Sequence, residues 1–257
     1  MGDSTALSAT TPLTTDTAYQ TTDLASLSAR DRLIVALDFP AAAEALALVE
    51  RLKGRARWFK VGLELFLAAG PGIVETLAGR GYSVFLDLKL HDIPNTVAGG
   101  VRSAAGLGAG LMTVHAGGGP VMLRAAREAA ASVPGAPKLL AVTVLTSMDA
   151  GQLAATGVAR EPGAQVELLA RMGMEAGMDG FVCSPQEVAK LRAMTGPGGT
   201  LVIPGIRPAG AARGDQSRVA TPAAALRDGA SYLVVGRPIT QADDPARAVE
   251  GILGEMG

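Results

Sequence analysis

Cysteine and net charge are both scarce in this sequence, and each shortage excludes a class of protein. Cys183 is the only cysteine among 257 residues, so the chain forms no internal disulfide, and no cluster of Cys and His offers the ligands of a structural zinc site. The formal net charge of −1 provides no basic surface for a phosphate backbone. We therefore expect a reducing, cytoplasmic environment, no metal site and no nucleic-acid partner.

Long apolar runs are also missing. Asp, Glu, Lys or Arg interrupts every apolar stretch before it reaches the roughly 18 residues that a bilayer span needs. The first basic residue is Arg30, so the N-terminus has neither the charged start nor the apolar centre of a secretory signal. We expect a soluble protein that is not exported and has no membrane partner.

The chain divides into a short tail and one long domain. Residues 1–28 are rich in Ser and Thr and show no helical or strand periodicity, which predicts a flexible tail. From 29 to 257, short apolar runs alternate with longer stretches rich in Ala, Leu, Glu and Arg, the βα alternation of a parallel sheet. The predicted strands are Leu33–Asp38, Arg57–Gly62, Ser83–Lys89, Leu111–His115, Lys138–Leu145, Gly180–Cys183, Thr200–Ile206 and Tyr232–Gly236.

The number and character of these strands predict the fold class. Their apolar residues are continuous and do not alternate, as expected for strands that are covered on both faces. Apolar residues recur at helical spacing in Ala41–Leu52 and Gln165–Ala176, and residues 147–163 have room for an extra short helix. Eight βα units favour a single-domain α/β fold, the (β/α)8 or TIM barrel, over a doubly wound sheet, which usually has five or six strands.

Charged residues gather at the predicted carboxyl ends of the strands, where barrel enzymes carry their active sites. Asp38 ends the first strand, Lys60 lies on the second, Asp87 and Lys89 lie on the third, and Asp92 follows it. Asp87 and Lys89 are two residues apart, so they project from the same face of their strand. Alternating opposite charges would stabilise one another there and present an ammonium group as a proton donor. The alternative is an ion-pair network that only fixes the barrel register.

The last two units carry the pattern of a phosphate site. Backbone N–H groups at Gly236 and the start of a following helix would cradle a phosphate, and Arg237 adds a planar charged fork. The stretch Pro208–Arg218 has no strong periodicity and includes Gln216 near its end. It is interpreted as a mobile lid, with an ordinary surface loop as the alternative.

Several motifs, in the same order along the chain, resemble one enzyme family. The segment Asp87-Leu-Lys-Leu-His-Asp-Ile-Pro-Asn-Thr96 resembles the catalytic segment of the orotidine 5′-phosphate decarboxylases, which form UMP in pyrimidine synthesis. The resemblance extends over nearly the whole chain after the tail. It includes the motifs Ala-Leu-Asp38, Phe-Lys60-Val-Gly, Thr-Val-Leu-Thr146-Ser-Met, Pro-Gly-Ile-Arg207-Pro, Gly-Asp-Gln216 and Val-Gly-Arg237-Pro-Ile.

The resemblance implies a role for each of these positions. Lys89 would donate the proton to C6 of the pyrimidine, with Asp87 beside the substrate carboxylate. Lys60 would bridge the ribose and the charged array, while Asp38 would bind ribose hydroxyls and Thr146 the pyrimidine. The phosphate would be held by Arg207, Gln216, Gly236 and Arg237. Asp92 and Thr96 would reach into the neighbouring subunit's site of a homodimer, and no cofactor would be required.

Three further residues have structural interpretations, and two other functions stand as alternatives. His91 and His115 are interpreted as packing or hydrogen-bonding residues, and Cys183 as a core residue. One alternative function is a metal-dependent decarboxylase or aldolase acting on a sugar phosphate, which would need a carboxylate pair at a divalent cation. Another is a barrel that binds UMP as a regulator without turning over a substrate.

Overall fold

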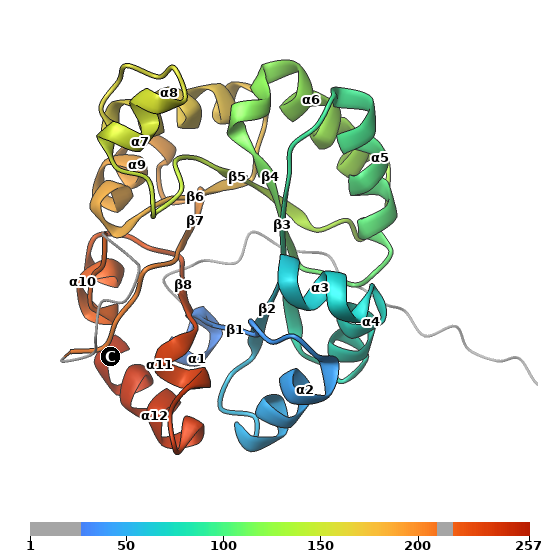
Figure 1. Ribbon diagram of the computed structural model, residues 1–257, viewed down its shortest axis with the longest axis vertical. Helices are drawn as coiled ribbons and strands as arrows, with labels where there is room; N and C mark the ends of the chain where they lie inside the picture. The colour runs from blue at the N-terminus through green and yellow to red at the C-terminus, as the bar shows by residue number, and fades with distance from the viewer. Residues whose placement is uncertain (1–26, 210–217) are drawn as a thin grey trace, which may run out of the picture.

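The eight strands form one closed, parallel barrel in chain order, from β1 to β8 (Figure 1). The structure is a computed structural model and describes residues 27–209 and 218–257. The predicted TIM barrel is therefore confirmed. The strands are β1 Leu33–Ala36, β2 Trp58–Gly62, β3 Ser83–Leu90, β4 Leu111–His115, β5 Lys138–Val142, β6 Gly180–Val182, β7 Thr200–Ile203 and β8 Tyr232–Val235.

Two separate apolar clusters explain why the strands are apolar along their whole length. Ile34 pairs with Trp58 on one side and with Val234 on the other, which closes the barrel between β1 and β8. These three side chains belong to a cluster completed by Ala36, Phe85, Leu111, Leu140 and Val202. The alternate strand residues, such as Val35 and Phe59, belong to the larger cluster that includes the buried faces of the helices. Each strand thus contributes to both clusters, as in other barrels of this kind.

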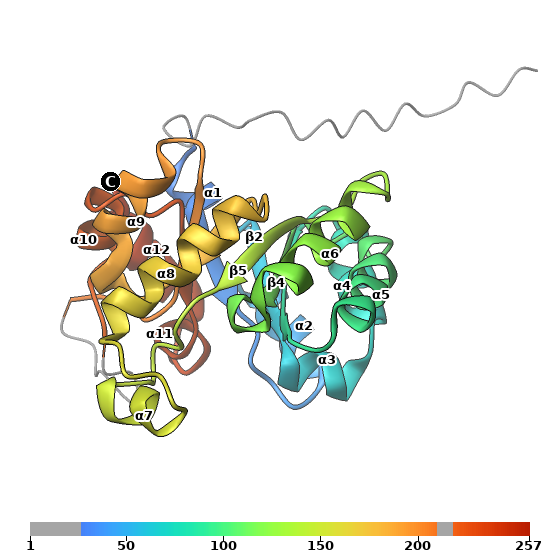
Figure 2. The ribbon, with the colours of Figure 1, turned by 90° about the horizontal axis from the view of Figure 1, so that it is seen from above.

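Helices surround the barrel on its outside (Figures 1 and 2). They are α1 Ala29–Arg32, α2 Ala42–Arg51, α3 Leu63–Ala69, α4 Gly72–Gly79, α5 Pro94–Ala105, α6 Gly119–Ala131, α7 Ala150–Ala155, α8 Pro162–Glu175, α9 Val188–Thr195, α10 Pro222–Arg227, α11 Arg237–Thr240 and α12 Pro245–Met256. Two 3-10 turns, η2 Ala116–Gly118 and η3 Pro185–Glu187, precede α6 and α9. The predicted helices correspond to α2 and α8, and the predicted short helix in 147–163 is α7, which Asp149 caps.

Several strands end earlier than the sequence predicts. The strands β1, β5, β6, β7 and β8 stop one to three residues before the predicted ends, at Ala36, Val142, Val182, Ile203 and Val235. Beyond these points the chain enters the loops at the carboxyl end of the barrel, although the backbone N–H groups of Leu37 and Thr143 still donate to the carbonyl oxygens of Lys60 and Val182. Apolar composition continues past the strand ends because the residues that follow still pack against the barrel, as buried Leu37, Val144 and Ile206 do.

Parts of two predictions fall outside the described residues. The predicted tail lies there except for Leu27 and Ser28, and Ser28 accepts a hydrogen bond from the backbone N–H of Asp31 and caps α1. Most of the predicted lid, including Gln216, also lies there. Within the described part of the chain, no helix is long and apolar enough to cross a membrane.

Candidate active site

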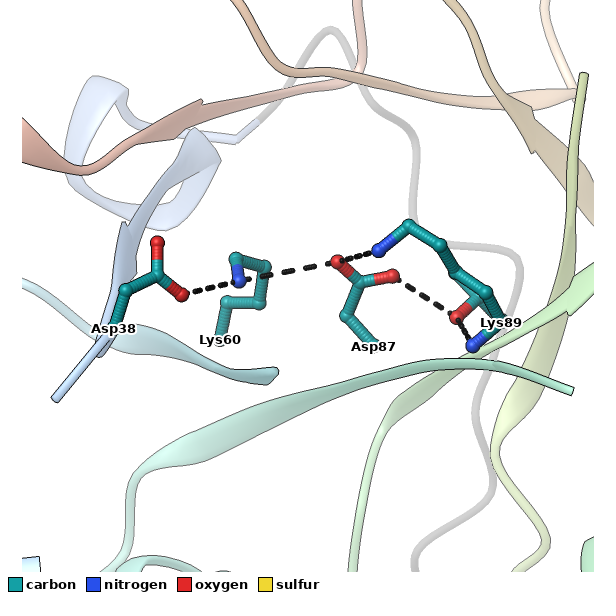
Figure 3. Close-up of polar contacts among 5 residues, drawn as sticks. Asp38, Lys60, Asp87 and Lys89 are labelled. Atoms are coloured by element: carbon teal, nitrogen blue, oxygen red, sulfur yellow. Dashed lines mark hydrogen bonds and ion pairs between the residues drawn. The ribbon is translucent and has the colours of Figure 1, made fainter. Parts of the chain in front are cut away.

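Four charged side chains form a line across the carboxyl end of the barrel, which we call the charged array (Figure 3). Its members are Asp38, Lys60, Asp87 and Lys89. Lys60 Nζ donates a hydrogen bond to Asp38 Oδ1 at 2.8 Å and lies 3.8 Å from Asp87 Oδ2. Lys89 Nζ donates to the same Asp87 Oδ2 at 2.8 Å. The predicted alternation of negative and positive groups is therefore present.

The strand period explains why these side chains meet. Lys60 and Asp87 each come two residues after a residue of the inner apolar cluster, Trp58 and Phe85. Because side chains alternate along a strand, both continue the inward-facing row and reach its open end. Asp87 is 8% exposed, so its carboxylate is largely shielded from water and depends on its hydrogen bonds.

Lys89 occupies an irregular position in β3. The pairing of β3 with β4 shifts register between Leu86 and Leu90, and Lys89 has a φ of 52°, in the left-handed region that non-glycine residues rarely adopt. A bulge of this kind re-aims the side chains that follow it. The sequence predicts a regular strand here, so the bulge is a finding of the structure.

Thr113 on β4 joins the array to the bulge. Its hydroxyl donates to Asp87 Oδ1 at 3.0 Å and accepts a hydrogen bond from the backbone N–H of Lys89 at 2.8 Å. Thr113 is fully buried and comes two residues after Leu111 of the inner cluster. Sequence reasoning missed this residue, although a hydroxyl in the apolar run Leu111–His115 was a visible signal.

Two adjoining cavities meet at the array. A cavity of about 170 Å³ is lined by Asp87, Lys89 and Thr146 together with apolar side chains such as Val142 and Val182. A second cavity, of about 490 Å³, is lined by polar residues that include Asp38, Arg207, Gly236 and Arg237. Both include Lys60, Pro204 and Val234 in their walls, so they form one cleft with an apolar end and a cationic end. This shape suits a flat ring joined to an anionic group.

The cationic end lies above β7 and β8. Arg207 is 7% exposed, and its Nη1 donates to the carbonyl oxygen of Ile206 at 3.0 Å. Its backbone N–H donates to the carbonyl oxygen of Ala220, which fixes the start and the return of the loop after β7. Gly236 precedes the first turn of α11, which begins with Arg237. The predicted phosphate residues that the structure describes are therefore brought together.

A buried ion pair beside the cleft was not predicted. Arg218 Nη1 donates to Glu187 Oε1 at 2.6 Å, and Arg218 Nη2 donates to the carbonyl oxygen of Leu145 at 2.9 Å. Both side chains are less than a tenth exposed. Because Leu145 precedes Thr146, the pair also anchors the loop that carries this candidate base-binding residue.

Asp92 and Thr96 lie apart from the array of their own chain. Both are exposed, Asp92 in the loop after β3 and Thr96 in the first turn of α5. Asp92 Oδ1 accepts a hydrogen bond from the backbone N–H of Ile93 at 2.6 Å. Neither residue lines either cavity of the cleft.

The histidines and the cysteine agree with their structural interpretation. The rings of His91 and His115 stack with centroids 5.1 Å apart, and His115 Nδ1 accepts a hydrogen bond from the backbone N–H of Gly117. Burial, then the charges of His91 and Lys89, lower the pKa of His115. Burial raises the pKa of Cys183, which keeps it a neutral core thiol. Among residues 27–209 and 218–257, no group of three or more His, Cys, Asp or Glu side chains is arranged to hold a metal ion.

Comparison with known proteins points to one family. The family model described as orotidine 5′-phosphate decarboxylase / HUMPS family matches residues 31–252. An orotidine 5′-phosphate decarboxylase of Halorhodospira halophila is 56% identical over 225 residues, which cover 88% of this chain and 95% of the relative. One from Moorella thermoacetica is 51% identical over 240 residues, covering 91% and 95%. The crystal structure of orotidine 5′-phosphate decarboxylase from Lactobacillus acidophilus has a TM-score of 0.77 at 40% identity, covering 88% of this chain and 99% of that one.

Proposed function

Because this chain belongs to the orotidine 5′-phosphate decarboxylase family and forms UMP and CO2 from orotidine 5′-phosphate in de novo pyrimidine synthesis, we propose that Lys89 donates the proton that replaces the carboxylate at C6. The observation that carries this proposal is the charged array, in which the Lys89 ammonium lies 2.8 Å from Asp87 at the apolar end of the cleft.

The array suits a decarboxylation that has no electron sink. Loss of CO2 from C6 leaves an sp2 carbanion that the ring does not delocalise, so fixed charges must stabilise it. Two unit charges about 4 Å apart interact by about 4 kcal/mol at an effective dielectric of 20. Lys89 would stabilise the developing carbanion by an energy of this order and then protonate it. Asp87 would repel the substrate carboxylate, and we assign the larger effect to Lys89.

The remainder of the cleft supplies binding energy at a distance from C6. Lys60 lies in the walls of both cavities and Asp38 in the wall of the polar one, where ribose hydroxyls would reach them, and Thr146 would contact the pyrimidine. Arg207, Gly236 and Arg237 would hold the phosphate, with Gln216 as a further contact outside the described residues. Binding energy from the phosphate can then be used to assemble the site around the reacting ring.

We propose further that two copies of the chain complete each site. Asp92 and Thr96 are exposed in the single chain and would enter the site of the second copy. Three apolar side chains, Ile93 next to Asp92 and two on α3, are also exposed: Leu63 is 51%, Leu67 79% and Ile93 67% accessible to solvent. These follow the adjacent strands β2 and β3, so a twofold contact there would cover apolar surface and bring Asp92 towards the partner's array.

The site is proposed to work without a metal or organic cofactor, in the cytoplasm, where the free thiol of Cys183 stays reduced. The test of Lys89 follows the loss of ultraviolet absorbance of orotidine 5′-phosphate in the presence of EDTA. The wild-type chain should form UMP, and Lys89→Ala should lose that activity while its melting temperature and circular dichroism stay those of the wild type. Turnover by folded Lys89→Ala at a rate comparable to the wild type would exclude the proposed role. Activity that disappears in EDTA and returns with magnesium would contradict cofactor independence.

A further inference from the structure

We propose that Thr113 is a positioning residue for the decarboxylation, because one buried hydroxyl fixes both the carboxylate of Asp87 and the backbone of Lys89. The inference rests on the roles proposed above for Asp87 and Lys89. It adds a residue that lies behind the array and does not line the cleft.

The hydrogen bonds of Thr113 determine where its hydroxyl proton points. The backbone N–H of Lys89 can only donate, so Thr113 Oγ1 accepts from it at 2.8 Å. A hydroxyl has a single proton, and the remaining partner is Asp87 Oδ1 at 3.0 Å, which accepts it. Because Thr113 is fully buried, water does not compete for these bonds.

This arrangement fixes the carboxylate of Asp87 in one orientation. Oδ1 is occupied by Thr113, which leaves Oδ2 facing the two ammonium groups, 2.8 Å from Lys89 Nζ and 3.8 Å from Lys60 Nζ. Without the hydroxyl, the carboxylate of Asp87 would be free to turn about its bond to Cβ. The contacts of Lys89 Nζ and Lys60 Nζ with Asp87 Oδ2 would then no longer have a fixed position.

The same hydroxyl holds the bulge that aims Lys89. A non-glycine residue with a φ of 52° is strained and persists only where its surroundings hold it. In this bulge, β3 and β4 are out of regular register, and Thr113 provides the acceptor for the Lys89 N–H. Removing that acceptor would leave a buried N–H unpaired and allow the backbone at Lys89 to relax.

The chain offers a matched set of variants. Thr113→Val keeps the shape and removes both hydrogen bonds, whereas Thr113→Ser keeps the hydroxyl. Thr143 on the chain just after β5 is a control, because it is 1% exposed and its hydroxyl donates to the carbonyl oxygen of Val182 at 2.9 Å and not to a member of the array. Thr143→Val therefore measures what the loss of a buried barrel hydroxyl costs by itself.

The proposal predicts an effect on kcat and little effect on KM. In Thr113→Val, kcat for orotidine 5′-phosphate should fall about a hundredfold, the cost of a displacement near 1 Å in a reacting group. KM should change less than about threefold, since the phosphate contacts, which supply binding energy far from the array, are untouched. Thr113→Ser should restore kcat to within about fivefold of the wild type, and Thr143→Val should leave it within about threefold.

Three results would overturn the proposal: wild-type kcat in Thr113→Val, equal losses in Thr113→Val and Thr143→Val, or no recovery in folded Thr113→Ser. If Thr113→Val does not fold, Thr113→Ala is compared with Thr113→Ser by the same criteria. Lys89→Ala, assayed in parallel, separates the two levels of inference. Activity in Lys89→Ala would refute the proposed function, whereas an inactive Lys89→Ala beside a fully active Thr113→Val would refute only the role of Thr113.

Discussion

Replacing Gly62 by alanine should slow catalysis without unfolding the barrel. Gly62 ends β2 with a φ of −95°, which any residue can adopt. A Cβ at this position would lie 2.8 Å from Lys60 Nζ and 3.4 Å from Asp38 Oδ1. The closer atom is the end of a flexible side chain, so the fold can accommodate the methyl group at little cost. The ammonium of Lys60 must move instead.

The size of the effect follows from the geometry. If Lys60 Nζ moves about 1 Å from its 2.8 Å contact with Asp38, their attraction at an effective dielectric of 20 falls by about 1.5 kcal/mol. Where that attraction helps to align the transition state, the loss corresponds to about a tenfold decrease in kcat/KM. The exposure of Asp38 makes this an upper value, because water screens the pair.

The assay compares the wild-type chain with four variants by steady-state kinetics and melting temperature. Gly72→Ala is the control, since its Cβ meets nothing within 4 Å. Gly62→Ala should lose about tenfold in kcat/KM with a melting temperature close to that of Gly72→Ala. In a Lys60→Ala background, Gly62→Ala should cause no further loss, because the clash is gone. Unchanged kcat/KM in Gly62→Ala, or an equal loss with and without Lys60, would show that the position of the Lys60 ammonium does not limit catalysis.

Three further predictions concern the phosphate end, acid stability and the buried ion pair. Arg237→Ala should weaken UMP binding by about 1.5 to 3 kcal/mol, roughly tenfold to a hundredfold, and leave uridine binding unchanged in calorimetric titrations. An equal loss of affinity for UMP and for uridine would mean that Arg237 has a structural role. Because the pKa of His115 is lower in the folded chain than its usual 6.5, its contribution to stability is complete above about pH 6.5 and is lost as the pH falls through the folded value. The variant His115→Asn keeps an acceptor for the N–H of Gly117 but has no group that titrates. Its urea midpoint should therefore fall less than that of the wild type between about pH 7 and pH 5. An equal fall in both chains would exclude His115 as a cause of the loss of stability in acid. Glu187→Gln removes the charge that pairs with Arg218. The free energy of unfolding should fall by about 3 to 5 kcal/mol, which lowers the melting temperature by roughly 6 to 20 °C. A decrease below about 2 °C would show that the ion pair is not needed for stability.

The barrel was predictable because its signal is repeated eight times. Continuous apolar strands and intervening amphipathic stretches reflect two clusters, one inside the barrel and one beneath the helices, and each strand supplies both. Strand ends were less predictable. Apolar composition reports burial, and Val144 and Ile206 are buried beyond the ends of β5 and β7.

The charged array was predictable in composition but not in all of its geometry. Lys60 and Asp87 follow the two-residue period of their strands, so their meeting could be predicted. The position of Lys89 depends on a bulge that the sequence around it does not signal, and on a hydrogen bond to Thr113, 24 residues away. The ion pair of Arg218 with Glu187 likewise joins distant segments and has no local pattern. Contacts of this kind arise from the closed barrel and not from neighbouring residues.

In the proposed homodimer, Lys89 of one chain works together with Asp92 of a second copy. This pairing can be measured by mixing Lys89→Ala chains with Asp92→Ala chains. If each site takes Lys89 from one chain and Asp92 from its partner, a mixed dimer contains one intact site and one with both lesions. With statistical exchange, half of the dimers are mixed, so the mixture should recover about a quarter of the wild-type activity from nearly inactive parents. A mixed dimer isolated with two affinity tags that shows no recovery, or a fully active parent variant, would rule out the shared site.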